Sequence, residues 1–132
     1  MSDLPRVRVV AGILCGSQGN VLIADRVRSR SLQDHWEFPG GKLIDGETAE
    51  AALSRELQEE LGIVVRAAQH FQHLEHDYPD LNVAIDFFLV SDWQGEPSGV
   101  EGQQVKWVTI NTLNEQKLLP ADAPVIKALR GL

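Results

Sequence analysis

The feature that most constrains this chain is the segment "GGKLIDGETAEAALSRELQEELGI" at residues 40–63. Leucine recurs there at four-residue spacing, at Leu53, Leu57 and Leu61. This period predicts an amphipathic helix over residues 48–61 that turns its leucines towards a core. Thr48 is a suitable N-cap residue, and Gly62 is a suitable residue to end the helix. The segment therefore predicts a glycine-containing loop that leads directly into a helix.

The polar face of this predicted helix gathers carboxylates and contains no lysine. Glu56, Glu59 and Glu60 stand at positions i, i+3 and i+4, so they share a face beside the leucine stripe. Like charges at this spacing repel by about a few tenths of a kcal/mol per pair. A divalent cation such as Mg²⁺ offsets that repulsion, because it prefers oxygen ligands and shares its shell with water and substrate phosphates. The pattern favours a phosphate-processing site, and a solvated charged helix face is the alternative.

The composition is that of an ordinary globular chain, with 43% apolar and 23% charged residues among 132. This length predicts a single domain over residues 1–132, since domains commonly run to about 100–150 residues. The net charge of −7 leaves no broad basic surface for a polymeric nucleic acid. No apolar run approaches the roughly 20 residues of a membrane span, and the single cysteine suits a reducing compartment. We therefore expect a cytoplasmic protein with neither nucleic acid polymers nor membranes as partners.

Outside the helical segment the chain is mostly β in character. Two β-branched runs at residues 7–15 and 21–25 are separated by "GSQGN", which predicts a hairpin of paired strands. "LNVAIDFFLV" alternates with period two, and "QVKWVTI" is a further short strand. A second helix is expected to begin near Pro124, since proline suits the first helical turn. Strands flanking two helices predict an α/β or α+β sandwich.

Fixed spacings around the helix identify a family resemblance. From Gly41, five residues lead to Glu47 and seven more lead to Arg55, followed in order by the three glutamates, Gly62 and Ile63. Every fixed position of the Nudix box is matched. The segments "WEFPGGK", "HDYPD", "GEPSGVEGQ" and "LPADAPVIKAL" extend the similarity over nearly the whole chain. Within the Nudix family, the sequence resembles the MutT-type 8-oxo-dGTP diphosphatases.

The resemblance implies a fold and a reaction. The fold is the Nudix α/β/α sandwich, with a mixed sheet between helices. The reaction is the attack of water on an inner phosphorus of a nucleoside triphosphate, which releases a monophosphate and pyrophosphate with the assistance of Mg²⁺, for which Mn²⁺ is a possible substitute. A small-molecule nucleoside triphosphate is therefore the implied partner, and a monomer is expected. For 8-oxo-dGTP, the implied role is nucleotide-pool sanitation and mutation avoidance.

The resemblance also implies roles for individual residues. Glu56, Glu59 and Glu60 would bind metal together with the Gly41 carbonyl, and Arg55 would hold the glutamates in place. Glu101, in "GVEGQ", matches an acidic position of the family. Either Glu56 or Glu101 is suited to accept the proton of the attacking water, and both alternatives stay open. The candidates for phosphate contact are Arg26 and Lys42.

Phe38 and Asp122 match the base-reading positions of the family. The best-known pattern has asparagine in place of Asp122, and an amide both donates and accepts whereas an ionised carboxylate only accepts. Leu81 likewise stands where the 8-oxo-dGTP enzymes can carry an arginine. A carboxylate accepts well from the cytosine amino group, and "PAD" also resembles the CTP pyrophosphohydrolases, so a CTP or dCTP pyrophosphohydrolase is the alternative. An N-cap of the last helix is the structural alternative for Asp122.

Two further hypotheses carry less weight. On a regular strand the three histidines of "HFQHLEH" divide between two faces, with His70 and His76 on one and His73 on the other, which does not favour a zinc site. A nucleotide-sensing Nudix module without activity would be expected to lose a metal-binding glutamate, and this chain retains all three.

Overall fold

The structure is a computed structural model that describes residues 5–25, 35–118 and 122–132. Its elements are, in chain order, β1 (Arg6–Leu14), the 3-10 helix η1 (Ser17–Gly19), β2 (Asn20–Asp25), β3 (Trp36–Glu37), β4 (Gly40–Lys42), α1 (Ala49–Leu61), β5 (Val64–Asp77), β6 (Asn82–Gln94), β7 (Val105–Thr109), the 3-10 helix η2 (Ile110–Glu115) and α2 (Ala123–Arg130). Among these, no helix is long and apolar enough to cross a membrane.

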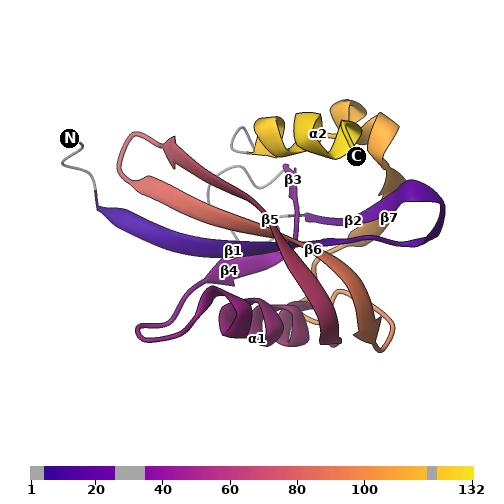
Figure 1. Cartoon of the computed structure of the whole chain (residues 1–132), viewed down its shortest axis with the longest axis horizontal. Coiled ribbons are helices and arrows are strands. Elements are labelled where there is room, and N and C mark those ends of the chain that lie inside the picture. The colour runs from indigo at the N-terminus through magenta and orange to yellow at the C-terminus, as the bar shows by residue number, and fades with distance from the viewer. Residues whose placement is uncertain (1–4, 26–34, 119–121) are drawn as a thin grey trace.

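The strands form two sheets that lie between the two α-helices (Figure 1). The larger sheet has the order β4-β1-β6-β5 and is mixed, because β1 runs parallel to β6 while the other neighbours are antiparallel. The smaller sheet, β3-β2-β7, is antiparallel. The predicted α/β/α sandwich is confirmed, with a second small sheet beside the mixed one.

The predicted hairpin of residues 7–15 and 21–25 is wrong, although both strands exist. β1 pairs with β4 and β6, whereas β2 pairs with β3 and β7, and an isolated bridge between Cys15 and Val21 joins the two runs. β1 is buried on both faces at its C-terminal end. A strand of this kind is a central strand that needs partners on both edges, and these partners come from distant parts of the chain.

Each face of β1 contributes to a separate hydrophobic cluster. Val10 and Leu14 pack with the leucines of α1 and with Phe88 and Val90 of β6. The alternate β1 residues, Ala11 and Ile13, pack in the second cluster, which includes Ile85, Phe87 and the α2 residues Val125, Ile126 and Leu129. α1 and α2 therefore cover opposite sides of the same central strands (Figure 1).

The predicted ends of α1 are confirmed. The Thr48 side chain accepts a hydrogen bond from the Ala51 N–H at 3.1 Å, and Gly62 ends the helix in the left-handed conformation with φ 72°. Leu53, Leu57 and Leu61 are completely or almost completely buried. These local signals place the carboxylate face of α1 at a defined angle to the sheet, because the leucine stripe can only face the core.

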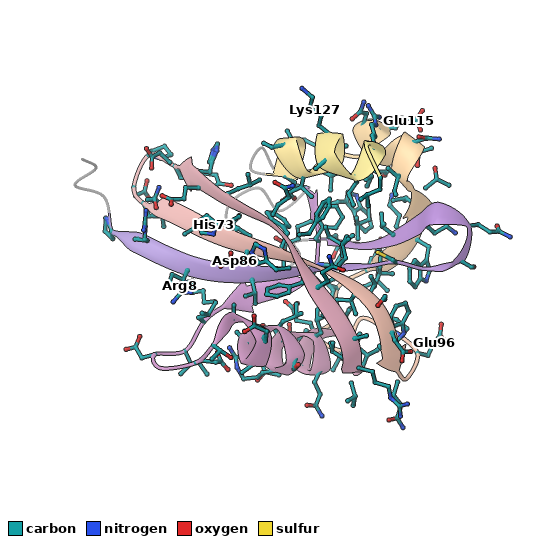
Figure 2. The ribbon with its side chains drawn as sticks, viewed as in Figure 1. Arg8, His73, Asp86, Glu96, Glu115 and Lys127 are labelled. Carbon is teal, nitrogen blue, oxygen red and sulfur yellow. The ribbon has the colours of Figure 1, made fainter. Side chains whose placement is uncertain are left out.

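The prediction that His70 and His73 face opposite sides is wrong. β5 departs from regular pairing with β6 at three places, one of them between His70 and Gln72. As a result, His70 Nε2 and His73 Nδ1 both donate to Asp86 Oδ1, at 2.9 and 2.8 Å. Figure 2 shows His73 of β5 beside Asp86 of β6. The hydrogen bond to Asp86 raises the pKa of His73. A bulge inserts one residue and so reverses the alternation that a regular strand would impose.

Candidate active site

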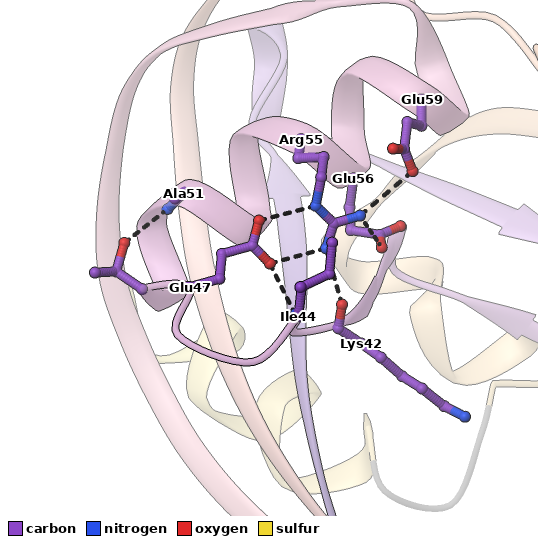
Figure 3. A network of polar contacts seen from close by, with 8 residues as sticks. Lys42, Ile44, Glu47, Ala51, Arg55, Glu56 and Glu59 are labelled. Atoms are coloured by element: carbon purple, nitrogen blue, oxygen red, sulfur yellow. Dashed lines mark hydrogen bonds and ion pairs between the residues drawn. The ribbon is translucent and has the colours of Figure 1, made fainter.

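Arg55 is the centre of a network that ties the loop before α1 to the helix itself (Figure 3). Its guanidinium forms a two-pronged contact with Glu47, from Nε to Oε2 at 2.8 Å and from Nη2 to Oε1 at 2.9 Å. Nη1 donates to Glu56 Oε1 at 2.8 Å and to Glu59 Oε2 at 3.4 Å. Nη2 also donates to the Lys42 carbonyl at 3.0 Å. One arginine therefore contacts three carboxylates and the loop backbone.

The charges in this network stabilise one another. Hydrogen bonds from Arg55 and from the Ile44 N–H lower the pKa of Glu47 to about 2. The hydrogen bonds to Glu47 and Glu56 raise the pKa of Arg55 above its ordinary value. Glu47 and Arg55 are therefore both ionised near neutral pH. Planar guanidinium groups suit such paired contacts because their N–H groups form a rigid fork.

The two adjacent glycines of the loop are required for two different reasons. A Cβ on Gly40 would lie 1.9 Å from the Val10 carbonyl oxygen, because β4 lies directly against β1 there. A Cβ on Gly41 would lie 2.4 Å from the carboxylate of Glu56. The first glycine permits the strands to approach, and the second leaves space for the carboxylate.

Glu60 and Glu56 are the most enclosed carboxylates of the α1 face. Glu60 Oε2 accepts a hydrogen bond from the Gly40 N–H at 2.9 Å. Burial, followed by the charges of Glu56, Glu37 and Glu101, raises the pKa of Glu60 to about 8. Burial likewise raises the pKa of Glu56, in spite of its hydrogen bond with Arg55. The site therefore concentrates more negative charge than its own cations neutralise.

The loop between β6 and β7 carries Glu101 to this face of the helix. The Ser98 N–H donates to the Leu61 carbonyl and the Val100 N–H donates to the Glu60 carbonyl, both at 3.1 Å. Glu101 contributes to the raised pKa values of Glu56 and Glu60, so its charge lies within range of both. Glu101, which follows Glu60 by about 40 positions in the chain, thus joins the carboxylates of α1.

The donor set suits a hard divalent cation. Carboxylate oxygens and a backbone carbonyl are the ligands that Mg²⁺ and Mn²⁺ prefer. A cation here would offset the cost of burial and the repulsion that together raise the pKa of Glu60. Within the described ranges, no three carboxylate, imidazole or thiol groups already stand close enough together to hold an ion. Water and substrate oxygens therefore have to complete the shell of a cation bound at this face.

A pocket of about 600 Å³ opens beside the loop of the two glycines. Its walls are mainly apolar, and its charged lining residues are Glu37, Lys42, Asp80 and Asp122. Asp122 is 4% exposed and forms no side-chain cap of α2, although it stands at the N-cap position. Phe38 is 3% exposed and packs edge-to-face on Phe87. Glu37, Gly40 and Gly41 line the pocket and adjoin the carboxylate face, so the two regions form one continuous site.

The structure brings most of the predicted site residues together. The carboxylate face is formed by Glu56, Glu60 and Glu101, with Gly41 beside them. Glu59 lies at the rim of this face, with 54% of its side chain exposed. Lys42, Phe38, Leu81 and Asp122 line the pocket. Arg26 lies outside the described residues.

Sequence reasoning missed Glu37. It lines the pocket and adds to the charge around Glu60. Its only signal in the sequence is its place beside Phe38 in "WEFPGGK", where a glutamate in a short strand has no spacing relationship to the glutamates of the helix.

The raised pKa of Glu60 predicts how the stability of the metal-free protein depends on pH. Between pH 4.5 and about 8 the folded chain keeps a proton on Glu60 that the unfolded chain has released. The free energy of unfolding therefore falls as the pH rises through this range. Glu60→Gln keeps an oxygen acceptor for the Gly40 N–H and removes the titration. We expect its Tm to exceed that of the unchanged protein at pH 8, in EDTA, and the two to converge near pH 5.

Comparing the two proteins at each pH cancels the contributions of other groups, such as His73, whose pKa is also raised. A difference in Tm between them that stays constant from pH 5 to pH 8 would contradict a buried, titrating Glu60.

Comparisons with known proteins identify the family of this chain. The NUDIX domain model matches residues 5–129. The chain is 38% identical to the 8-oxo-dGTP diphosphatase of Escherichia coli (strain K12) over 129 residues, which cover 98% of this chain and 100% of that one. It is 30% identical to the CTP pyrophosphohydrolase of the same strain over 126 residues, which cover 96% of this chain and 93% of that one. A solved MutT structure, from Aliivibrio salmonicida or Vibrio cholerae, has a TM-score of 0.81 and 40% identity, with 96% of this chain and 97% of that chain covered.

Nudix hydrolases generally need a divalent metal, which accords with a face of crowded carboxylates whose repulsion a cation would offset. The family model, the near-complete match to relatives and the box residues around α1 together lead to one conclusion: the chain belongs to the Nudix family and is a hydrolase that acts on phosphoric anhydride bonds.

Proposed function

We propose that this hydrolase converts 8-oxo-dGTP and water to 8-oxo-dGMP and pyrophosphate, and so removes an oxidised precursor from the nucleotide pool. The observation that carries the proposal is the junction of the apolar pocket with the carboxylate face through Gly40 and Gly41. A purine ring fits the pocket beside Phe38, and its triphosphate then extends past the glycines towards α1. The 8-oxo-dGTP diphosphatase of Escherichia coli, 38% identical, supports this choice of substrate.

In this proposal the carboxylates of Glu56, Glu59 and Glu60, the Gly41 carbonyl and Glu101 hold Mg²⁺, for which Mn²⁺ can substitute. When bound, the cation supplies charge neutralisation at the phosphate oxygens and lowers the pKa of water. Arg55 holds Glu47 and Glu56 through the contacts described above, so the metal ligands start from a fixed arrangement.

Other residues of the site move the proton and bind the substrate. Glu56 or Glu101 accepts the proton of the attacking water, because both carboxylates lie at the same face. Lys42 and Arg26 neutralise the triphosphate. The Phe38 ring and backbone and the Asp122 carboxylate hold the base.

Asp122 provides a prediction about base selection. An ionised carboxylate accepts from the N7–H of 8-oxoguanine but repels its O6, whereas an amide matches both atoms. We therefore expect Asp122→Asn to raise the ratio of kcat/KM for 8-oxo-dGTP to kcat/KM for CTP by about tenfold, the equivalent of one hydrogen bond. Steady-state kinetics with pyrophosphate detection give the ratio.

Asp80→Asn is the matched control, because Asp80 also lines the pocket but is exposed. It makes the same change from a carboxyl group to an amide and is expected to leave the ratio unchanged. A ratio that is the same in Asp122→Asn and in the unchanged enzyme would exclude Asp122 as a reader of the base.

A CTP or dCTP pyrophosphohydrolase is the second candidate. The buried carboxylate of Asp122 favours it, because a carboxylate accepts well from the cytosine amino group. The apolar side chain of Leu81, a residue of the pocket wall, offers no hydrogen bond to an oxidised purine. The relative named CTP pyrophosphohydrolase is 30% identical to this chain. It supports this candidate less strongly than the 8-oxo-dGTP diphosphatase, at 38% identity, supports the first candidate.

The deciding experiment compares kcat/KM for 8-oxo-dGTP, dGTP, CTP and dCTP with Mg²⁺, and measures monophosphate and pyrophosphate separately. A preference for 8-oxo-dGTP supports pool sanitation. A preference for CTP or dCTP would overturn it and make Asp122 a reader of the cytosine amino group. Release of orthophosphate in place of pyrophosphate would contradict both candidates, because it places the cleavage at the terminal phosphorus.

The single domain over residues 1–132, the monomer and the cytoplasmic location stay predictions. Light scattering at catalytic concentrations tests whether the protein is a monomer. Activity measured across salt concentrations, with polymeric DNA as competitor, tests the expectation that polymeric nucleic acid is not a partner.

A further inference from the structure

The C-terminal end of α1 is joined to the loop that carries Glu101. A helix leaves its last backbone carbonyls without partners inside the helix, and other groups have to satisfy them. Here the Leu61 carbonyl accepts from the Ser98 N–H. The Glu60 carbonyl accepts from the Val100 N–H at 3.1 Å and from the Gln103 side chain at 2.9 Å. The loop is therefore attached directly to the helix turn that carries Glu59 and Glu60.

The Gln103 side chain connects two of these segments at once. Its Nε2 donates to the Glu60 carbonyl at 2.9 Å, and its Oε1 accepts from the Glu101 N–H at 2.9 Å. An uncharged amide is the side chain that donates and accepts at its two ends without adding charge to an acidic site. Gln103 is partly buried, and its bond to the Glu60 carbonyl is partly shielded from water, whereas its bond to the Glu101 N–H is exposed.

We propose that Gln103 is a positioning residue that fixes the Glu101 backbone to the end of α1 and thereby sets the distance between Glu101 and the glutamates of the helix. This inference rests on the proposed role of Glu101 as a metal ligand and candidate proton acceptor. Gln103 contacts the backbone of both acidic residues and leaves their carboxylates able to act on the substrate. A misplacement of about 1 Å at such a site costs roughly a hundredfold in rate.

The test uses Gln103→Leu, which keeps a similar volume and removes both hydrogen bonds. We expect kcat for the preferred nucleotide to fall about ten- to a hundredfold, with a smaller change in KM, because the pocket for the base is not altered. Binding of Mn²⁺ alone, followed by electron paramagnetic resonance, is expected to weaken about tenfold. Gln104→Leu is the matched control, since Gln104 is exposed and contacts Asp25 through its backbone. It is expected to change neither measurement.

A double-mutant cycle with Glu101→Gln separates positioning from a general loss of stability. If Gln103 acts through Glu101, Gln103→Leu has little further effect on kcat and Mn²⁺ binding once Glu101→Gln is present. Full additivity of the two effects would overturn the proposal. Should Gln103→Leu not fold, Gln103→Met keeps the unbranched shape, adds no charge and also removes both hydrogen bonds. The same losses are then expected, and wild-type values would overturn the proposal.

The cycle also distinguishes failure of this inference from failure of the proposed function. If Glu101→Gln alone leaves kcat and Mn²⁺ binding unchanged, the assigned role of Glu101 is wrong and the positioning proposal fails with it. If Glu101→Gln impairs both while Gln103→Leu impairs neither, only the positioning proposal is overturned.

Discussion

Glu56→Gln is expected to lower kcat by about a thousandfold or more, the range in which loss of a principal electrostatic or acid–base group falls, while the chain stays folded. Glutamine keeps the size of the side chain and an oxygen that can accept from Arg55 Nη1. It cannot carry the negative charge that holds a cation or accept the proton of the attacking water. The chemistry is therefore removed while the contact that orders the loop is retained. The measurement is kcat with Mg²⁺ and the preferred nucleotide, with pyrophosphate detection.

Glu50→Gln is the matched control for this substitution. Glu50 lies on the same helix, in its first turn, and is exposed. Its loss of charge is expected to leave kcat within about twofold, because an exposed charge in water is strongly screened. The Tm of metal-free Glu56→Gln should not fall below that of the unchanged protein, since burial already raises the pKa of Glu56 and disfavours its charge. Near-normal turnover in Glu56→Gln would remove this residue from the mechanism.

Gly40→Ala is expected to reduce the free energy of unfolding by about 3 kcal/mol or more, at the upper end of the range for overpacked sites. The new Cβ would meet the Val10 carbonyl oxygen at 1.9 Å and the Ala11 Cα at 2.7 Å. Both atoms belong to the backbone of the central strand, which cannot move without disturbing its ladder with β6. Moving β4 away from β1 would also break the hydrogen bond from the Gly40 N–H to Glu60. Urea unfolding followed by tryptophan fluorescence measures the loss.

Gly131→Ala is the control for the same chemical change. At Gly131 the φ angle is −84° and a Cβ would lie 3.5 Å from the nearest carbonyl oxygen, which is ordinary contact. Its effect should stay within about 1 kcal/mol, the range for glycine positions that accept alanine. Equal stability of Gly40→Ala and Gly131→Ala would show that β4 does not lie as close to β1 as described.

The sequence alone identified α1, its caps, its buried leucines and its carboxylate face correctly, and it placed Glu47 and Arg55 in one unit. All these features depend on intervals of a few residues within one segment, and helix geometry converts such intervals directly into faces. The Nudix box is readable for the same reason, because the loop and the helix that it describes are adjacent in the chain. The strands β6 and β7 were likewise predictable as elements, since alternation and β-branching are local properties.

Other features required the tertiary structure. No local pattern assigns a partner to a strand, because every backbone offers the same N–H and C=O groups, so the expected hairpin of β1 and β2 was wrong. A single bulge in β5 brought His70 and His73 to one carboxylate, against the alternation of a regular strand. Three further features each join segments more than 20 residues apart in the chain. They are the place of Asp122 in the pocket, the approach of Glu37 to Glu60 and the attachment of the Glu101 loop through Gln103. The sequence therefore determined which chemistry the helix offers, and long-range packing alone decided which other residues surround it, because such contacts arise only once the sheets have closed.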